Sequence, residues 1–169
     1  MIRESNSAKI IKVISGGQTG ADQGGLAAAK SLGIETGGWA PKGWLTEDGP
    51  NPKLLKSYGL KESHGPYPVR TVQNIKESSF TIIIADKLDR GSLLTANQCL
   101  KNNKLFFHYH LGVSFIPSKY IKKELGNPSN SLFPVRLILN VAGNRESRSP
   151  GIYEKTKQLI TKFLEDFNQ

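Results

Sequence analysis

The sequence is poor in cysteine and in long apolar runs, and each shortage excludes a class of protein. The 169 residues include one cysteine, Cys99, so no disulfide can form within the chain and a zinc site built from several cysteines is excluded. No window approaches the roughly 18 to 20 apolar residues that span a bilayer. Residues 1–9 are polar and lack the apolar run of a secretory signal. We therefore expect a cytoplasmic protein without a membrane segment.

Acidic residues are also scarce. Asp and Glu number 14 against 23 Lys and Arg, which gives a formal net charge of +9. Such an excess suggests an acidic partner, which could be a nucleotide, a phosphorylated small molecule or a nucleic acid. The basic residues are scattered, however, and aromatic residues are not interleaved with them as base stacking would need. We interpret most of the charge as solvated surface, with nucleic acid the less favoured partner.

The remaining composition is that of an ordinary globular protein, with 37% apolar and 22% charged residues. The length predicts one domain, a ligand-binding domain over 1–169. Strands are predicted at residues 10–14, 34–39, 80–85, 105–107 and 136–141. Helices are predicted at residues 21–32, from 51, at 71–77, 92–101 and 150–167. This alternation predicts an α/β fold of the Rossmann-like, doubly wound type, with a mainly parallel sheet and helices on both faces.

Three loops directly follow predicted strands, and ligands of such sheets bind at that edge. The first loop contains Gly16, Gly17, Gln18 and Thr19 and leads into Asp22. Its glycines let the backbone approach a ligand, and the N-terminus of the next helix favours an anion. The loop matches neither the P-loop nor the dinucleotide-binding pattern. The alternative is a tight turn in which Thr19 caps the helix.

Asp22 complicates an anion site, because a carboxylate repels a phosphate. It could meet a hydroxyl, a base edge or a metal, or it could simply compensate the helix dipole. In the second loop Gly91, Ser92 and Thr95 could offer N–H and hydroxyl groups to an anion, or Ser92 could be an N-cap.

The third loop holds Gly143, Asn144, Arg145 and Glu146, followed by Arg148. Two arginines just before a helix suit a phosphate or a carboxylate, although a solvated loop is the alternative.

Other candidates carry weaker arguments. Trp39 could stack on a planar ring with Lys42 near an anion, whereas Trp44 is expected to pack against the core. His108 and His110 lack a third ligand nearby, so no protein-ligated metal is expected. The adjacent acids Glu47 and Asp48 make a weak acid/base pair, since neighbouring loop residues seldom share a substrate.

Five segments in order resemble one known family. They are Ser-Gly-Gly-Gln-Thr-Gly-Ala-Asp-Gln-Gly-Gly-Leu (15–26), Gly-Gly-Trp-Ala-Pro-Lys-Gly (37–43), Tyr-Pro-Val-Arg-Thr with Asn74 (67–74), Gly-Ser-x-x-Thr (91–95) and Asn-Val-Ala-Gly-Asn-Arg-Glu-Ser with Pro-Gly (140–151). Together they resemble the "putative molybdenum carrier" family. That family is placed in the SLOG group of Rossmann-like domains, with the Lonely Guy phosphoribohydrolases and the molybdenum cofactor carrier proteins.

The resemblance implies a carrier that binds a nucleotide-like or pterin-phosphate ligand, either a nucleotide or the molybdenum cofactor, across the strand ends. The glycine loop and the loop at 91–95 would form the cradle, and Asn144, Arg145 and Glu146 would close it. Related folds are often dimers or larger, so a homo-oligomer stays open.

The chain departs from its hydrolase relatives at one position. Lonely Guy enzymes resemble it in the second loop but carry a catalytic Glu where this chain has Thr95. The resemblance therefore implies binding rather than catalysis. The alternatives are a nucleotide-processing enzyme such as a phosphoribohydrolase, with Asp22, Asp89 or Glu146 replacing that Glu, and a weak nucleic-acid binder.

Overall fold

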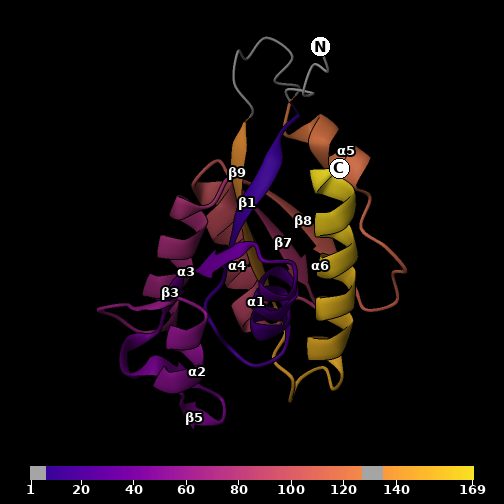
Figure 1. Cartoon of the computed structure of the whole chain (residues 1–169). Coiled ribbons are helices and arrows are strands. Elements are labelled where there is room, and N and C mark those ends of the chain that lie inside the picture. Colours follow the sequence, from indigo (N-terminus) through magenta and orange to yellow (C-terminus); the bar gives the residue numbers. More distant parts are fainter. Residues whose placement is uncertain (1–6, 127–134) are drawn as a thin grey trace.

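The computed structural model describes residues 7–126 and 135–169, and its centre is a five-stranded sheet in which every pairing is parallel (Figure 1). The strand order is β2-β1-β9-β7-β8. The strands are β1 (Lys9–Ile14), β2 (Glu35–Gly37), β7 (Phe80–Ile84), β8 (Leu105–Tyr109) and β9 (Arg136–Gly143). The last strand in sequence thus lies between β1 and β7, so the C-terminal ends of three strands meet at one edge.

Helices cover both faces of this sheet, which confirms the predicted doubly wound α/β architecture (Figure 1). One face carries α1 (Ala21–Ser31), α5 (Ser118–Glu124) and α6 (Ile152–Asn168). The other carries α3 (Tyr67–Glu77) and α4 (Arg90–Lys101). No helix in the described part of the chain combines the length and the apolarity that a membrane crossing requires.

The larger apolar core lies between the sheet and the face with α1 and α6. It includes Val13, Ile82, Val141 and Phe163, none of them more than 1% exposed. A smaller cluster joins Ile83 of β7 to Ala96 of α4 on the opposite face. Because β7 is buried on both faces, its sequence is a continuous apolar run, as expected of a central parallel strand.

Residues 38–66 form a separate elaboration at the C-terminal edge of the sheet. It contains β3 (Trp39–Ala40) paired with β6 (Lys61–Glu62), the 3-10 turn η1 (Lys42–Trp44), the hairpin of β4 (Leu45–Thr46) and β5 (Gly49–Pro50), and α2 (Pro52–Ser57). The elaboration packs onto Leu26 of α1 through Leu55 and Leu60. Trp44 packs against the same cluster, so its predicted core role is confirmed.

The helix starts show where local sequence rules hold and where they fail. Asn51 caps α2 as predicted, since its side chain accepts the N–H of Leu54 at 3.3 Å. Ser92 is not the cap of α4: Asp89 is, accepting the Ser92 N–H at 2.9 Å. The prediction that a helix starts at Thr71 is wrong, because α3 begins at Tyr67.

Thr19 does not cap α1 either. The N-cap is Gly20, which has no side chain to accept a hydrogen bond, and it adopts φ 80°. A side chain there would meet the backbone of the β9–α6 loop, with the carbonyl oxygen of Asn144 only 2.6 Å away. The close approach of two loops therefore decides this helix start.

The contact between α1 and β9 predicts the effect of enlarging Gly25. An added Cβ would lie 2.6 Å from Cβ of Val141, on a strand with no room to move. We expect Gly25→Ala to lower the free energy of unfolding by up to about 2 kcal/mol, because an overpacking cost of about 1–3 kcal/mol is only partly offset by the roughly 1 kcal/mol that alanine gains in helix propensity. Urea unfolding measures this. Gly91→Ala is the control, since its Cβ would meet only Asp89 at 3.6 Å, and an equal loss there would refute the packing argument.

Candidate functional site

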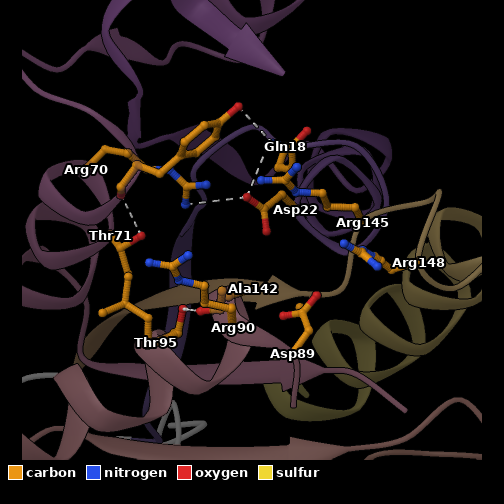
Figure 2. A pocket seen from close by; sticks show the side chains of 14 residues that line it. Gln18, Asp22, Arg70, Thr71, Asp89, Arg90, Thr95, Ala142, Arg145 and Arg148 are labelled. Carbon is orange, nitrogen blue, oxygen red and sulfur yellow. Dashed lines mark hydrogen bonds and ion pairs between the residues drawn. The ribbon is translucent and has the colours of Figure 1, made fainter. Parts of the chain in front are cut away.

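A cleft of about 500 Å³ lies at the C-terminal ends of β1, β7 and β9 (Figure 2). Four separate segments line it: the glycine loop after β1, the first turn of α3, the start of α4, and the end of β9 with the loop that follows. The lining residues are Gln18, Asp22, Tyr67, Arg70, Thr71, Asp89, Arg90, Gly91, Leu94, Thr95, Ala142, Gly143, Arg145 and Arg148. The cleft thus occupies the position where ligands of doubly wound sheets bind.

The charge of the cleft is strongly positive. Arg70, Arg90, Arg145 and Arg148 face it, against two carboxylates, Asp22 and Asp89. Within residues 7–126 and 135–169, the guanidinium groups of Arg90, Arg145 and Arg148 have no hydrogen-bond or ion-pair partner. Arginines left without carboxylate partners around one concave site retain their capacity for a bound anion.

The fourth arginine is buried. Arg70 extends from α3 across the glycine loop, its side chain 12% exposed. It lies directly over Gly16, where a Cβ would come within 1.9 Å of its Nη1. Gly16 is therefore needed so that the guanidinium can lie against the backbone. Arg70 Nε is buried and has no hydrogen-bond partner among the described residues.

Arg70 faces Asp22, which lies in the first turn of α1. Their closest atoms, Arg70 Nη1 and Asp22 Oδ2, are 3.7 Å apart, which is close enough for an ion pair but too far for a hydrogen bond. The same Oδ2 accepts the N–H of Gln18 at 3.1 Å. Burial raises the pKa of the Asp22 carboxyl above its ordinary value, although the charge of Arg70 opposes this. Burial also lowers the pKa of the Arg70 guanidinium.

Tyr67 joins the two arginines on this side of the cleft. Its ring centroid lies 5.5 Å from Cζ of Arg70 and 5.3 Å from Cζ of Arg145, so both cations contact the ring. Its hydroxyl accepts a hydrogen bond from Gln18 Nε2 at 3.3 Å. In Figure 2 the Asp22 carboxyl lies between the guanidinium groups of Arg70 and Arg145.

Of the residues predicted from the sequence, six line the cleft: Gln18, Asp22, Gly91, Thr95, Gly143 and Arg145. The other eight do not. Gly17 packs beneath the loop instead, where a Cβ would meet the Leu55 side chain at 2.7 Å. Gly143 has its own reason to be glycine, because a Cβ there would lie 1.9 Å from the carbonyl oxygen of Ile84.

Asn144 and Ser92 support the cleft from below. Asn144 is 3% exposed, and its side chain accepts the N–H of Asp86 at 3.1 Å while donating to Lys87 O at 3.1 Å and to Ser92 Oγ at 3.3 Å. Its amide groups are thereby used within the protein. Asn144 joins the loop after β9 to the loop after β7, so it positions the cleft and does not line it.

Glu146 is likewise engaged elsewhere. Its two carboxylate oxygens accept the N–H groups of Gly151 at 2.5 Å and Tyr153 at 2.9 Å. These are the free donors at the start of α6, so Glu146 acts as a helix cap. Glu146 lies in the loop expected to close the cleft, but its carboxylate does not line the cleft.

Trp39 and Lys42 also lie outside the cleft lining. The indole N–H of Trp39 donates to Glu77 at 2.7 Å, and Lys61 lies 5.5 Å from its ring. Lys42 is exposed in η1. Both residues belong to the elaboration at 38–66, whose position the strand pattern alone could not predict.

Glu47 forms an unexpected connection over the glycine loop. Its carboxylate accepts hydrogen bonds from the hydroxyls of Thr19 and Ser147, and its own N–H donates to Gln18 Oε1 at 2.7 Å. Burial alone would raise the pKa of Glu47, but these hydrogen bonds outweigh it and leave the pKa below its ordinary value. Glu47 thus fastens the hairpin to both strand-end loops, and it shares no such network with Asp48.

Sequence reasoning missed Tyr67, Arg70 and Arg90, and it used Arg148 only as a neighbour of Arg145. Tyr67 and Arg70 belong to the segment 67–74, which contributed to the family resemblance without being assigned a role. No local pattern indicates that a helix 50 residues further along the chain lies over the glycine loop. The structure also places one of the two candidate histidines. His108 Nε2 lies 2.7 Å from Ala85 O, and the described residues contain no group of three or more potential metal-ligating side chains.

The network around Glu47 predicts a pH-dependent loss of stability in Glu47→Gln. The lowered pKa means that the carboxylate stabilises the fold above its ordinary value of 4.5, and that this contribution disappears as pH falls through the folded-state pKa. We expect the variant to be less stable by about 1 kcal/mol at pH 7 and equal to the wild type in acid. Chemical unfolding at several pH values measures this. A pH-independent difference, or an equal loss in the exposed neighbour Asp48→Asn, would contradict it.

Comparison with known proteins supplies the family. The sequence profile of the circularly permutated YpsA SLOG family matches residues 13–164. A crystal structure described as a "putative molybdenum carrier protein" from Syntrophus aciditrophicus SB is similar over 96% of this chain and 97% of its own, with 34% identity and a TM-score of 0.73. No match was found among curated proteins. The chain therefore belongs to the circularly permutated YpsA SLOG family, and it is similar to a protein described as a putative molybdenum carrier.

Proposed function

We propose that this protein binds one anionic small molecule in the cleft and holds it by a phosphate or similar oxyanion group. The observation that carries the proposal is the set of three guanidinium groups, on Arg90, Arg145 and Arg148, that have no hydrogen-bond or ion-pair partner among the described residues and lie beside the buried Arg70. Guanidinium groups match oxyanions in a planar, two-donor geometry. The N-terminus of α4 opens onto the same cleft at Gly91 and adds its partial positive charge.

The size of the cleft supports a small ligand. About 500 Å³ falls within the usual range for nucleotide- or cofactor-sized molecules. A strand of nucleic acid would instead need an extended basic groove with aromatic platforms. In this cleft Tyr67 is the aromatic residue, and its ring is already in contact with two guanidinium groups.

The donor set also bears on how molybdenum would be held. The similar carrier suggests molybdenum as cargo, but the cleft lining contains neither cysteine nor histidine. Arginines bind oxyanions and phosphates and do not ligate a metal ion. The lining therefore fits molybdenum as an oxyanion, or as a pterin cofactor held by its phosphate, and it fits a nucleotide phosphate equally.

The positions of the carboxylates favour a carrier over a hydrolase. Hydrolysis of an N-glycosidic bond needs an acid/base group at the reacting atoms. Asp89 caps α4 and Glu146 caps α6, so two of the three carboxylates that could replace the missing Glu are bound to helix N-termini. Thr95 donates its hydroxyl to Gly91 O at 3.1 Å. Of the three, Asp22 is the carboxyl that lines the cleft without capping a helix.

Calorimetric titration with AMP, inorganic phosphate and molybdate tests the proposal. We expect at least one of them to bind with one site per chain. Arg145→Met should weaken that binding by about 10- to 150-fold, because a shielded charge-assisted contact contributes about 1.5–3 kcal/mol. Lys42→Met removes the same charge from an exposed position outside the cleft, so it is the matched control.

Two results would contradict the proposal. If none of the three anions binds to the wild-type protein, the cleft is not an oxyanion site of this kind. If Arg145→Met and Lys42→Met weaken binding equally, the effect comes from net charge and not from the cleft. Binding of oligonucleotides with a steep dependence on salt would favour the nucleic-acid alternative instead.

A further inference from the structure

A buried carboxyl lies in the middle of a cleft that otherwise presents positive charge. Asp22 is 4% exposed and lines the same cavity as the four arginines. Its one ion-pair partner in the described part of the chain, Arg70, is 3.7 Å away and makes no hydrogen bond to it. An anion bound by Arg70 and Arg145 would therefore lie close to the Asp22 carboxylate, which is buried and cannot turn away into solvent.

The charged groups around Asp22 come from every segment that builds the cleft. Arg70 and Arg145 act on it directly, and the other charged or titratable groups lining the same cavity are Tyr67 from α3, Arg148 from the loop after β9, and Asp89 and Arg90 from the start of α4. In the protein alone, burial opposes the ionised form of Asp22, whereas the charges of Arg70 and Arg145 favour it. A bound anion would offset those positive charges, so the balance would shift toward the protonated form.

Two negative charges in contact cannot both persist in a shielded site, and the usual resolution is that they share one proton. We propose that the Asp22 carboxylate takes up one proton from solvent when the anion binds, and that the resulting carboxylic O–H donates a hydrogen bond to an oxygen of that anion. This inference rests on the proposed function and names its ligand more closely: the group beside Asp22 is a fully ionised oxyanion oxygen that acts as an acceptor. A ligand hydroxyl at this position would instead donate to an ionised Asp22.

The proposal has a definite sign. Because the complex holds one more proton than the free protein and free anion together, affinity falls as pH rises. Between the pKa of Asp22 in the free protein and its pKa in the complex, the slope approaches tenfold per pH unit, as expected for uptake of about one proton. Below the free-protein pKa, Asp22 is already protonated and affinity becomes independent of pH.

The isosteric variant Asp22→Asn separates proton donation from packing. The Asn oxygen can still accept the N–H of Gln18, as Asp22 Oδ2 does at 3.1 Å. The Asn amide then supplies an N–H donor in place of the carboxylic O–H. This variant should bind the anion at all pH values about as tightly as the wild type binds it in acid. Asp22→Ala, which provides neither the acceptor nor the donor, should bind the anion more weakly than Asp22→Asn does.

The experiment is a calorimetric titration with molybdate, which stays fully ionised from neutral pH upward, and with AMP. Wild type and Asp22→Asn are compared between pH 5 and 9 for AMP and between pH 7 and 9 for molybdate. The phosphate of AMP has its own titration near pH 6. Because that titration affects both proteins equally, the difference between their profiles isolates Asp22. Titrating the wild type in two buffers of different ionisation enthalpy counts the protons directly and does not depend on any variant.

We expect the wild type to take up close to one proton on binding and to lose affinity as pH rises. The affinity of Asp22→Asn should not depend on pH, apart from the effect of the ligand's own titration. Binding without proton uptake, with identical profiles for the two proteins, would overturn the proposal and assign Asp22 to a ligand hydroxyl or to packing. Failure of both anions to bind the wild type would instead refute the proposed function.

Discussion

The buried pair of Arg70 and Asp22 is the interaction on which the rest of the cleft depends. It joins α3 to the start of α1 across the glycine loop, at a distance of 3.7 Å. A guanidinium this deeply buried would be costly without a carboxylate nearby, and the pair itself is incompletely hydrogen-bonded. Two features of the surroundings accompany Arg70. Gly16 must lack a side chain, and the Tyr67 ring contacts the Arg70 guanidinium while its hydroxyl accepts a hydrogen bond from Gln18.

The order of the strands explains why residues so distant in sequence meet. Because β9 lies between β1 and β7, the loops at 15–22, 86–92 and 143–149 become neighbours. Asn144 then ties the loop after β9 to the loop after β7, and its backbone oxygen accepts the N–H of Ala21. The C-terminal helix α6 returns to β1, where Asn168 bonds both backbone groups of Ile10.

Sequence patterns predict the central strands of the sheet well because those strands are buried. A continuous apolar run such as 80–84 occurs where both faces of a strand are covered, and such a run can be recognised within a short stretch of sequence. The start of α3 was misplaced because Pro66 and Pro68 precede and open that helix, and neither offers a capping side chain. The short helix α5 gave no pattern of sufficient length. Glycine, arginine and asparagine after strands identified the correct edge of the sheet.

Individual roles within that edge were harder to predict. Asn144, Glu146 and Arg145 are neighbours of similar polarity, yet the first bonds two other loops, the second caps α6 and the third faces the cleft. Only tertiary geometry separates these roles. Arg70 could not be predicted at all, because its importance comes from the packing of α3 over the glycine loop. The excess of basic residues does not predict this site, although four arginines converge on one cavity.

The measurement that tests the central claim most directly is a crystal structure of the protein with molybdate, located by the anomalous scattering of molybdenum. The account predicts one strong peak per chain inside the cleft, within hydrogen-bond distance of the guanidinium groups of Arg70 and Arg145 and beside the carboxyl of Asp22. A peak outside the cleft, or an empty cleft in crystals where molybdate binds elsewhere on the surface, would contradict the assignment of this cavity as the oxyanion site.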